Sequence, residues 1–261
     1  MDWSRAKTIL IWAFLFLDLF LGYQVYATRY LQWTSTESVK NGAWDLELYL
    51  KQQNITLSSE MPQETPEMKY LNVEYQGFQL PMHMLPDQRI TLQKTSIISY
   101  FVQPFPVTDV KNLEDWLQMM DQRIMYANQY HPDRRLSNSA RLQYWQYHGK
   151  YPLFVSPLEF TIENNLVKKY KQTYVHIRNQ GSGRQVISAY TALRSLVENE
   201  IIQPGAKIDD VTLGYYGYYY DADIQVLAPV WRFIHNGNID YINGFTGAIE
   251  RPPDDKYSMQ R

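Results

Sequence analysis

An apolar run near the start of the chain constrains its fold more than any other feature. Residues 9–26 read ILIWAFLFLDLFLGYQVY, which is apolar except for Asp18 at the middle and Gln24 near the end. A single helix needs about 20 apolar residues to cross a bilayer. The run therefore predicts one membrane helix, at residues 9–27, with a large domain on one side of the membrane.

Asp18 makes this predicted span costly without preventing its insertion. An Asp at the centre of a membrane helix costs about 2.5–3.5 kcal/mol, while each Leu, Ile, Phe or Val returns about 0.3–0.6 kcal/mol. The Leu, Ile, Phe and Val residues of the run together return roughly 3–7 kcal/mol on that scale. An ionisable group inside a membrane usually has a function and a partner. The alternative is an Asp18 that is protonated, or reached by water, and has no role.

The spacing around Asp18 predicts a contact face. Five residues recur at intervals of four and three and so share one stripe of the helix. They are Ile11, Leu15, Asp18, Gly22 and Val25. Gly22 would let another backbone approach closely on the face that carries the acid. We therefore predict that this stripe contacts a partner within the membrane.

The flanking charges predict the orientation of the span. Arg5 and Lys7 precede the run, and only Arg29 follows it closely. The positive-inside rule then places residues 1–8 in the cytoplasm and the large domain outside it. A cleavable signal peptide, ending at 25–27, is the competing interpretation. The length of the run and the acid within it favour an uncleaved anchor.

Composition limits the remaining possibilities. The chain has 25 basic and 27 acidic residues, a net charge of −2, and no basic run that would indicate a nucleic acid partner. It has no cysteine, so neither a disulfide nor a thiol-linked lipid can contribute. About 230 residues follow the span, which is enough for one large domain or two small ones with real cores.

Residue patterns predict an α+β ectodomain of two tandem units, each a helix with an antiparallel sheet, at residues 28–106 and 107–261. Prolines at 104 and 106 should end the first unit. Helices are predicted at 37–52, 108–124 and 186–199. Strands are predicted at 70–80, 88–102, 141–148, 151–155, 158–162, 166–177, 208–216, 225–235 and 239–245.

No motif in the sequence predicts catalysis, a cofactor or a metal. The histidines lack a zinc-ligand spacing, and no GxSxG element is present. Asp221 and Asp223 lack the further oxygen ligands of a calcium loop. Glu159 and Glu163 could be a glycosidase pair, but the sequence does not give the separation that such a pair requires. The tyrosines at 215–220 could stack on sugars or a partner, or pack against the helix at 186–199.

The two ends of the chain resemble the YycI (WalI) family. The opening MDWSRAKTILIWAFLFLDLFLGYQVY is similar to the start of that family, as are VLAPVW at 226–231 and YINGFTG at 241–247. Members are membrane-anchored regulators of the WalK–WalR two-component system in Gram-positive bacteria. The organisation also matches, with a short cytoplasmic start, one span and an α+β ectodomain.

This resemblance implies a non-enzymatic role for the chain. It implies a YycH-type companion protein and a WalK-type sensor histidine kinase as partners, with contact through membrane helices that tunes control of cell-wall metabolism. It also implies an uncleaved anchor. The competing hypothesis is a membrane-anchored glycan-binding module or wall enzyme, and a plain structural tether is a third possibility.

Overall fold

The chain divides into two compact units, Met1–Gln53 and Asn54–Arg261. The computed structural model describes residues 7, 10–24, 46–58, 60–75, 87–107, 113–120, 123–217 and 224–250. In these parts of the chain, no helix combines the length and the apolar character that a membrane span requires. The predicted span at 9–27 includes residues outside the described ones.

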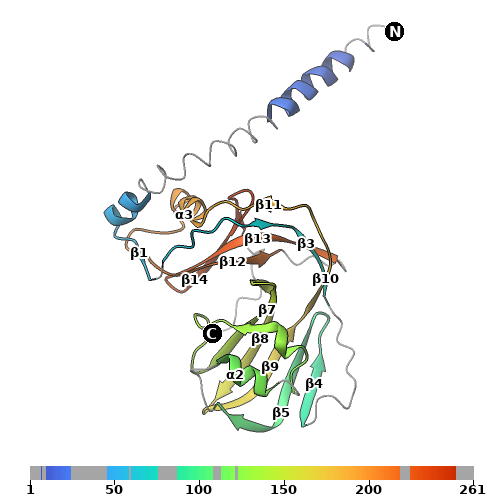
Figure 1. Cartoon of the computed structure of the whole chain (residues 1–261), viewed down its shortest axis with the longest axis vertical. Helices are drawn as coiled ribbons and strands as arrows, with labels where there is room; N and C mark the ends of the chain where they lie inside the picture. The colour runs from blue at the N-terminus through green and yellow to red at the C-terminus, as the bar shows by residue number, and fades with distance from the viewer. Residues whose placement is uncertain are drawn as a thin grey trace. The chain divides into compact units, whose positions relative to one another are not determined.

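The described part of the first unit consists of helical segments. Residues 10–24 form one helix, drawn in dark blue in Figure 1, and residues 46–52 form a second. Residues 37–45 of the helix predicted at 37–52 lie outside the described ones. Large apolar side chains are exposed all round the first helix, including Trp12 at 56%, Phe16 at 65% and Leu19 at 62%. Apolar area in water is unfavourable, and exposed apolar surface of this extent is typical of sites that contact another protein or lipid.

The second unit is an α+β domain that is mostly sheet, as the α+β prediction requires. Its helices are α2 (Leu113–Met119), α3 (Ala189–Glu198) and the 3-10 turn η1 (Ala127–Gln129). Its strands are β1 (Thr56–Leu57), β2 (Glu67–Met68), β3 (Leu71–Tyr75), β4 (Gln88–Leu92), β5 (Ser96–Pro106), β6 (Tyr130–Pro132), β7 (Arg141–His148), β8 (Tyr151–Glu163), β9 (Leu166–Thr173), β10 (Val175–Gln180), β11 (Arg184–Gln185), β12 (Lys207–Tyr216), β13 (Ile224–His235), β14 (Asn238–Asn243) and β15 (Ile249–Glu250).

One connected network of strands runs through this unit in the order β10-β3-β13-β12-β8-β9-β5-β4. Strands β3 and β10 pair antiparallel, with Tyr75 opposite Val175. The chain between them forms the inserted half, which contains β4 to β9 and α2. The other elements form the base half, in which β3 also pairs with β13. Both halves are visible in Figure 1, with β4, β5 and β9 in the inserted half and β12, β13 and α3 in the base half.

The core of the inserted half lies between α2 and one face of the sheet. Helix α2 buries Leu113, Trp116 and Leu117, whose i, i+3, i+4 spacing places them on one helix face. The Trp116 ring meets the Phe160 ring edge-on, with centroids 4.9 Å apart. The Tyr144 hydroxyl donates to the Leu113 carbonyl at 2.9 Å. A buried aromatic of this kind contributes about 3–5 kcal/mol when measured by truncation to Ala.

The base half packs α3 against the sheet. Ser188 caps this helix, because its hydroxyl accepts from the Thr191 backbone N–H at 3.1 Å. The Trp231 indole on β13 donates to the Ile187 carbonyl at 2.9 Å, just before the helix begins. Strand β8 reaches into this half, since Leu153 pairs with Tyr215 of β12 and joins the same apolar cluster.

Several predicted strands differ from the observed ones. The strand predicted at 88–102 is two strands, β4 and β5, which pair antiparallel through a turn at 93–95. The strands predicted at 151–155 and 158–162 are one strand, β8, and the strand predicted at 166–177 is divided between β9 and β10. Strand β5 continues through Pro104 and Pro106 because its register with β9 shifts between Tyr100 and Phe105. Prolines are tolerated at such an irregularity, where the sheet lacks a regular ladder.

The division into units at 28–106 and 107–261 stays a prediction. Strand pairing crosses the predicted boundary, because β5 pairs with β9 and β3 pairs with β10 and β13. The predicted helix at 108–124 corresponds to α2, while Ile124 lies beyond the helix and is buried in the core.

Candidate functional site

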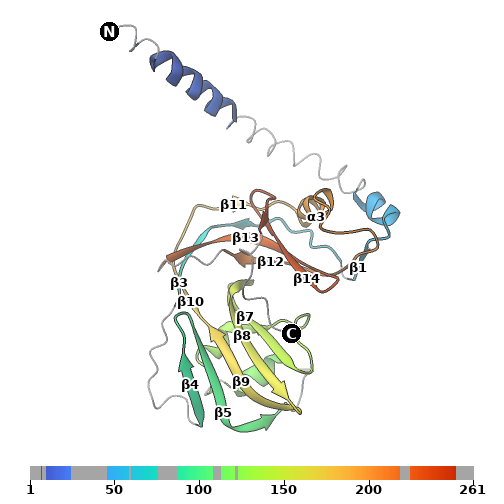
Figure 2. The same ribbon diagram turned by 180° about the vertical axis from the view of Figure 1, so that it is seen from behind.

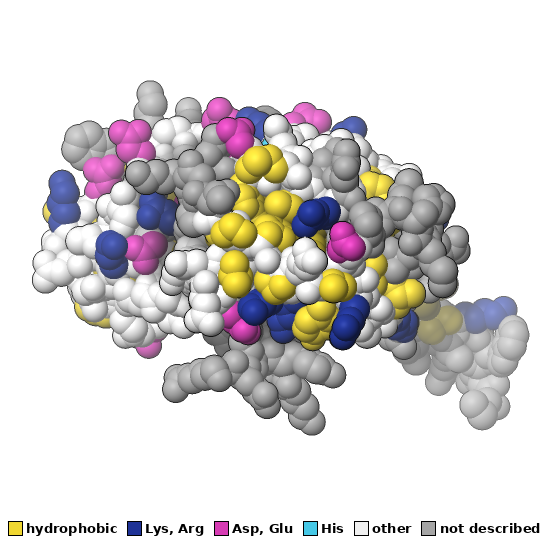
Figure 3. Space-filling model, turned by 90° about the horizontal axis from the view of Figure 1, so that it is seen from below, with side chains coloured by type: hydrophobic (Ala, Val, Ile, Leu, Met, Phe, Trp, Pro, Cys, Tyr) yellow, Lys and Arg dark blue, Asp and Glu magenta, His cyan; other side chains and the backbone are white. Residues whose placement is uncertain are grey.

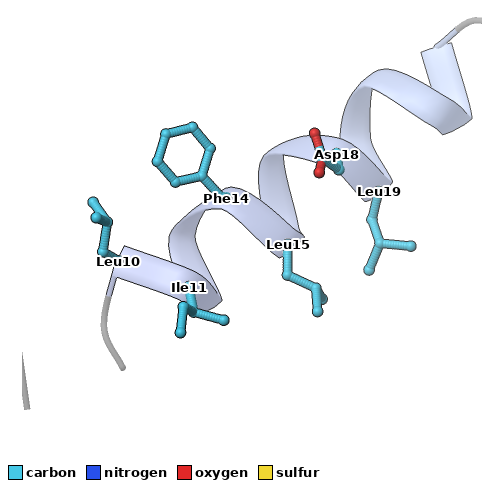
Figure 4. Close-up of a pocket in the computed structure, with 6 residues that line it drawn as sticks. All are labelled: Leu10, Ile11, Phe14, Leu15, Asp18 and Leu19. Carbon is cyan, nitrogen blue, oxygen red and sulfur yellow. The ribbon is translucent and has the colours of Figure 1, made fainter. Parts of the chain in front are cut away.

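The first candidate site is the face of the N-terminal helix that carries Asp18. Figure 4 shows Phe14 and Asp18 projecting together, beside a neighbouring row of apolar side chains. Six residues line a shallow surface along this helix: Leu10, Ile11, Phe14, Leu15, Asp18 and Leu19. Ile11, Leu15 and Asp18 of the predicted stripe are therefore neighbours on one face, as their helical spacing requires.

The remaining stripe residues are Gly22 and Val25. Gly22 lies in the same helix, and a Cβ added to it would meet nothing within 4 Å. Val25 lies outside the described residues. Ile11 is 65% exposed and Leu15 is 44% exposed, and no described side chain pairs with Asp18. The role of this stripe as a partner contact stays a prediction.

The second candidate site is a buried charge network that joins the two halves of the sheet domain. Arg232 on β13 forms an ion pair with Asp133, which follows β6, at 2.5 Å, and another with Asp210 on β12 at 3.0 Å. The side chains of Arg232 and Asp133 are 4% and 6% exposed. Asp133 also accepts a hydrogen bond from the Trp145 indole at 2.9 Å. We call these residues the junction.

Aromatic rings surround the charges of the junction. The Arg232 guanidinium lies over the Phe154 ring at 4.7 Å, and Phe154 contacts both Trp145 and Tyr241. Burial alone would lower the pKa of Arg232, but the charge and hydrogen bond of Asp133 raise it above its ordinary value. Arg232 therefore stays charged, and its ion pair with Asp133 connects the base half to the inserted half.

Two tyrosines of the run at 215–220 pack within the sheet domain. Tyr215 is 4% exposed and lies in the core of the base half, and Tyr216 stacks on Tyr241 with centroids 4.4 Å apart. The other tyrosines of the run, Asp221 and Asp223 lie outside the described residues. Across the described ranges, no group of three or more His, Cys, Asp or Glu side chains could hold a metal ion.

The sequence carried no signal for the junction. Asp133 and Arg232 are 99 positions apart, and neither lies in a motif. A pattern of local spacing cannot predict a pair that depends on how β6 and β13 are brought together. One available signal was Arg232 itself, a charged residue within the apolar strand VLAPVWRFI, since a charge inside a buried strand needs a partner.

The described residues form an α+β domain that is mostly sheet, preceded in the chain by two helical segments. The family model described as YycI protein matches residues 34–245, which is most of the chain. This chain belongs to the YycI family. That family is regulatory rather than enzymatic, and it is typically associated with membranes.

One solved structure shares the fold, and a second is similar at a lower TM-score. An uncharacterized protein from Eubacterium rectale matches with a TM-score of 0.51 and 8% identity, over 77% of this chain and 91% of that one. This likeness concerns the fold alone. YycH from Bacillus subtilis matches with a TM-score of 0.44 and 14% identity, over 69% of this chain and 52% of that one. No curated protein sequence matches the chain.

Proposed function

We propose that this chain is a membrane-anchored, non-enzymatic regulator that acts with a YycH-type companion on a WalK-type sensor histidine kinase. The kinase would in turn control cell-wall metabolism. The match of residues 34–245 to the YycI family carries this proposal. The anchor would be the helix predicted at 9–27, with residues 1–8 in the cytoplasm and the sheet domain outside it.

The N-terminal helix supports a contact within the membrane. Its apolar side chains are exposed in the described structure, so lipid or another helix would have to cover them. Asp18 lies on a face with Phe14, Ile11 and Leu15 and has no described partner. An acid in that environment is costly unless it is paired, so a polar group on a partner helix would stabilise the assembly.

Regulation requires that this contact differ between two states of the kinase. A regulator can shift a two-state equilibrium only by its difference in affinity for the two states. We propose that the Asp18 face binds one kinase state more tightly, while the sheet domain contacts the companion outside the membrane. The competing glycan-binding role would need exposed tyrosines at 215–220. Tyr215 is buried, and the tyrosines at 218–220 lie outside the described residues, so this role stays an alternative.

Relocating the acid tests this function. Asp18→Leu should leave membrane insertion intact but change kinase output or recovery of the companion and kinase. A double variant, Asp18→Phe with Phe16→Asp, keeps the composition of the helix and moves the acid to the opposite face, since two positions differ by about 200° of helical rotation. It should behave like Asp18→Leu. Phe16→Leu is the matched control and should behave like the wild type.

The outcome is read from cross-linking to partner helices and from kinase output in cells. If the relocated acid supports full output and full partner recovery, the face is not the contact and Asp18 has no role in recognition. If an inert span replaces residues 9–26 without effect, the helix is only a tether.

A further inference from the structure

One face of the sheet in the inserted half carries no described helix. Helix α2 packs on the other face, where Trp116 and Phe160 are buried. Figure 1 shows α2 in front of these strands, and Figure 2, the opposite view, shows β4, β5 and β9 in front. We call this surface the open face. Its side chains come from the alternate positions of β4, β5, β9, β8 and β7.

The strand register aligns cationic side chains across the open face. Pairing places Arg89 of β4 opposite Tyr100 of β5, and Tyr100 opposite Lys169 of β9. The row continues through Thr161 of β8 to Arg141 of β7. Neighbouring strands lie about 4.8 Å apart, so the backbones that carry Arg89 and Lys169 are about 10 Å apart. Two cations thus flank β5 on opposite sides.

Between these cations, β5 presents an apolar stripe. Ile98, Tyr100 and Val102 alternate along the strand, and Tyr100 and Val102 are 47% and 54% exposed. The Lys169 ammonium lies 5.8 Å from the centre of the Tyr100 ring. Lys171 stands opposite Ile98 in the next row. Figure 3 views the end of the molecule where β5 lies and shows hydrophobic side chains gathered together, with Lys and Arg side chains and some Asp and Glu side chains at their border.

The charges of this region are unbalanced. No described carboxylate lies within ion-pair distance of Arg89, Lys169 or Lys171. Glu159 of β8 lies directly opposite Lys171 in the strand register and forms an ion pair with Arg141 at 3.6 Å, so one acid lies among the four cations of this face. Arg89 and Lys169, which lie on opposite sides of the β5 stripe, have no ion pair among the described residues, and an acidic ligand would complement them.

We infer that the open face binds an acidic segment of a protein partner, whose apolar side chains cover Tyr100 and Val102 while its carboxylates meet Arg89, Lys169 and Lys171. An apolar centre with a charged rim is the usual composition of a protein–protein interface. A polyphosphate would use the cations but gain little from the apolar stripe.

This inference rests on the proposed function only in that a regulator needs a protein partner, and its test involves no kinase. Full-length protein in a non-ionic detergent is titrated into three fluorescent probes of equal length: a glutamate–tyrosine copolymer, polyglutamate and polyphosphate. Anisotropy should show the tightest binding for the copolymer. The double variant Lys169→Gln, Lys171→Gln should weaken it by about tenfold or more, because charged hydrogen bonds contribute about 1.5–3 kcal/mol and 1.4 kcal/mol is tenfold.

Matched variants separate this surface from net charge. Lys150→Gln with Lys207→Gln removes the same charge from lysines that already pair with carboxylates at 2.8 Å, and copolymer binding should stay within about twofold of the wild type. Tyr100→Ser should weaken the copolymer more than it weakens polyglutamate. The thermal midpoint of each variant is measured to check that it folds. Tyr100→Ser should fold normally, because the Tyr100 side chain is exposed.

Three outcomes would overturn the inference. Equal binding of polyphosphate and copolymer, with no effect of Tyr100→Ser, would assign the face to anionic polymers instead. If both lysine double variants lose the same amount of affinity for the copolymer, net charge alone explains the binding of that probe. No binding of any probe would show that the open face does not bind an acidic segment. None of these results bears on Asp18, so the inference and the proposed function can fail separately.

Discussion

Removing the carboxylate of Asp133 should destabilise the sheet domain strongly. The buried charge of Arg232 would then be paired with only one of its two carboxylates, that of Asp210. Breaking a buried ion pair by removing one partner costs about 3–5 kcal/mol. Asp210 remains 3.0 Å from Arg232 and its side chain is 21% exposed, so we place Asp133→Ala at the lower end, about 3 kcal/mol. For a unit of this size each kcal/mol lowers the melting temperature by about 2–4 °C, which gives a decrease of about 6–12 °C.

The assay is thermal unfolding of the full-length protein in detergent, followed by tryptophan fluorescence. Trp145, one of the seven tryptophans, donates to Asp133, so part of the emission comes from the site of the change. Glu64→Ala is the matched control, because its pair with Lys150 at 2.8 Å is exposed, with side chains 76% and 64% accessible. This control should leave the midpoint unchanged, since exposed pairs contribute little.

A double-mutant cycle with Arg232→Met then isolates the interaction. Removing both partners avoids an uncompensated buried charge, so the double variant should lose less than the sum of the two single losses. A decrease below about 2 °C for Asp133→Ala, or additive losses in the cycle, would refute the view that the junction holds the two halves together.

Three further predictions concern single positions. Gly214→Ala should lower the melting temperature clearly in the same assay, because an added Cβ would lie 2.6 Å from the Phe154 ring. Ser188→Ala should cost about 1 kcal/mol in urea unfolding, since it removes the cap of α3, while Ser188→Asn should retain most of the stability. Burial lowers the pKa of His148 below its ordinary value of 6.5. The folded protein therefore resists protonation there, so stability should decrease as pH falls below about 6.5, and His148→Gln should flatten that dependence in a pH series of melting temperatures.

The sequence predicted those helices and strands whose formation depends on residues close together in the chain. Helix α3 was predicted at 186–199 and observed at Ala189–Glu198, because its apolar spacing is regular and Ser188 supplies a cap. Strand β7 was predicted at its observed bounds from its aromatic content. The turn at 93–95 was missed because its sequence, QKT, contains no Gly, Pro, Asn or Asp.

Features that depend on distant segments could not be predicted in this way. Nothing near β3 indicates that its neighbours are β10 and β13, because pairing partners are selected by the assembled sheet. The junction has the same origin, since Asp133 and Arg232 meet only after both halves are in place. For the helix face, spacing alone placed Ile11, Leu15 and Asp18 side by side, but no pattern within one helix identifies what binds there.

The pairing of Tyr75 with Val175 has a consequence for how the protein is made. During synthesis β3 is complete long before either of its neighbours, β10 and β13, has left the ribosome. Both of its edges therefore stay open while the whole inserted half is produced, and open strand edges invite wrong pairings. A ribosome that stops before residue 224 would release a chain in which β3 still lacks β13. Such fragments should be frequent targets of proteolysis, while the finished chain resists it.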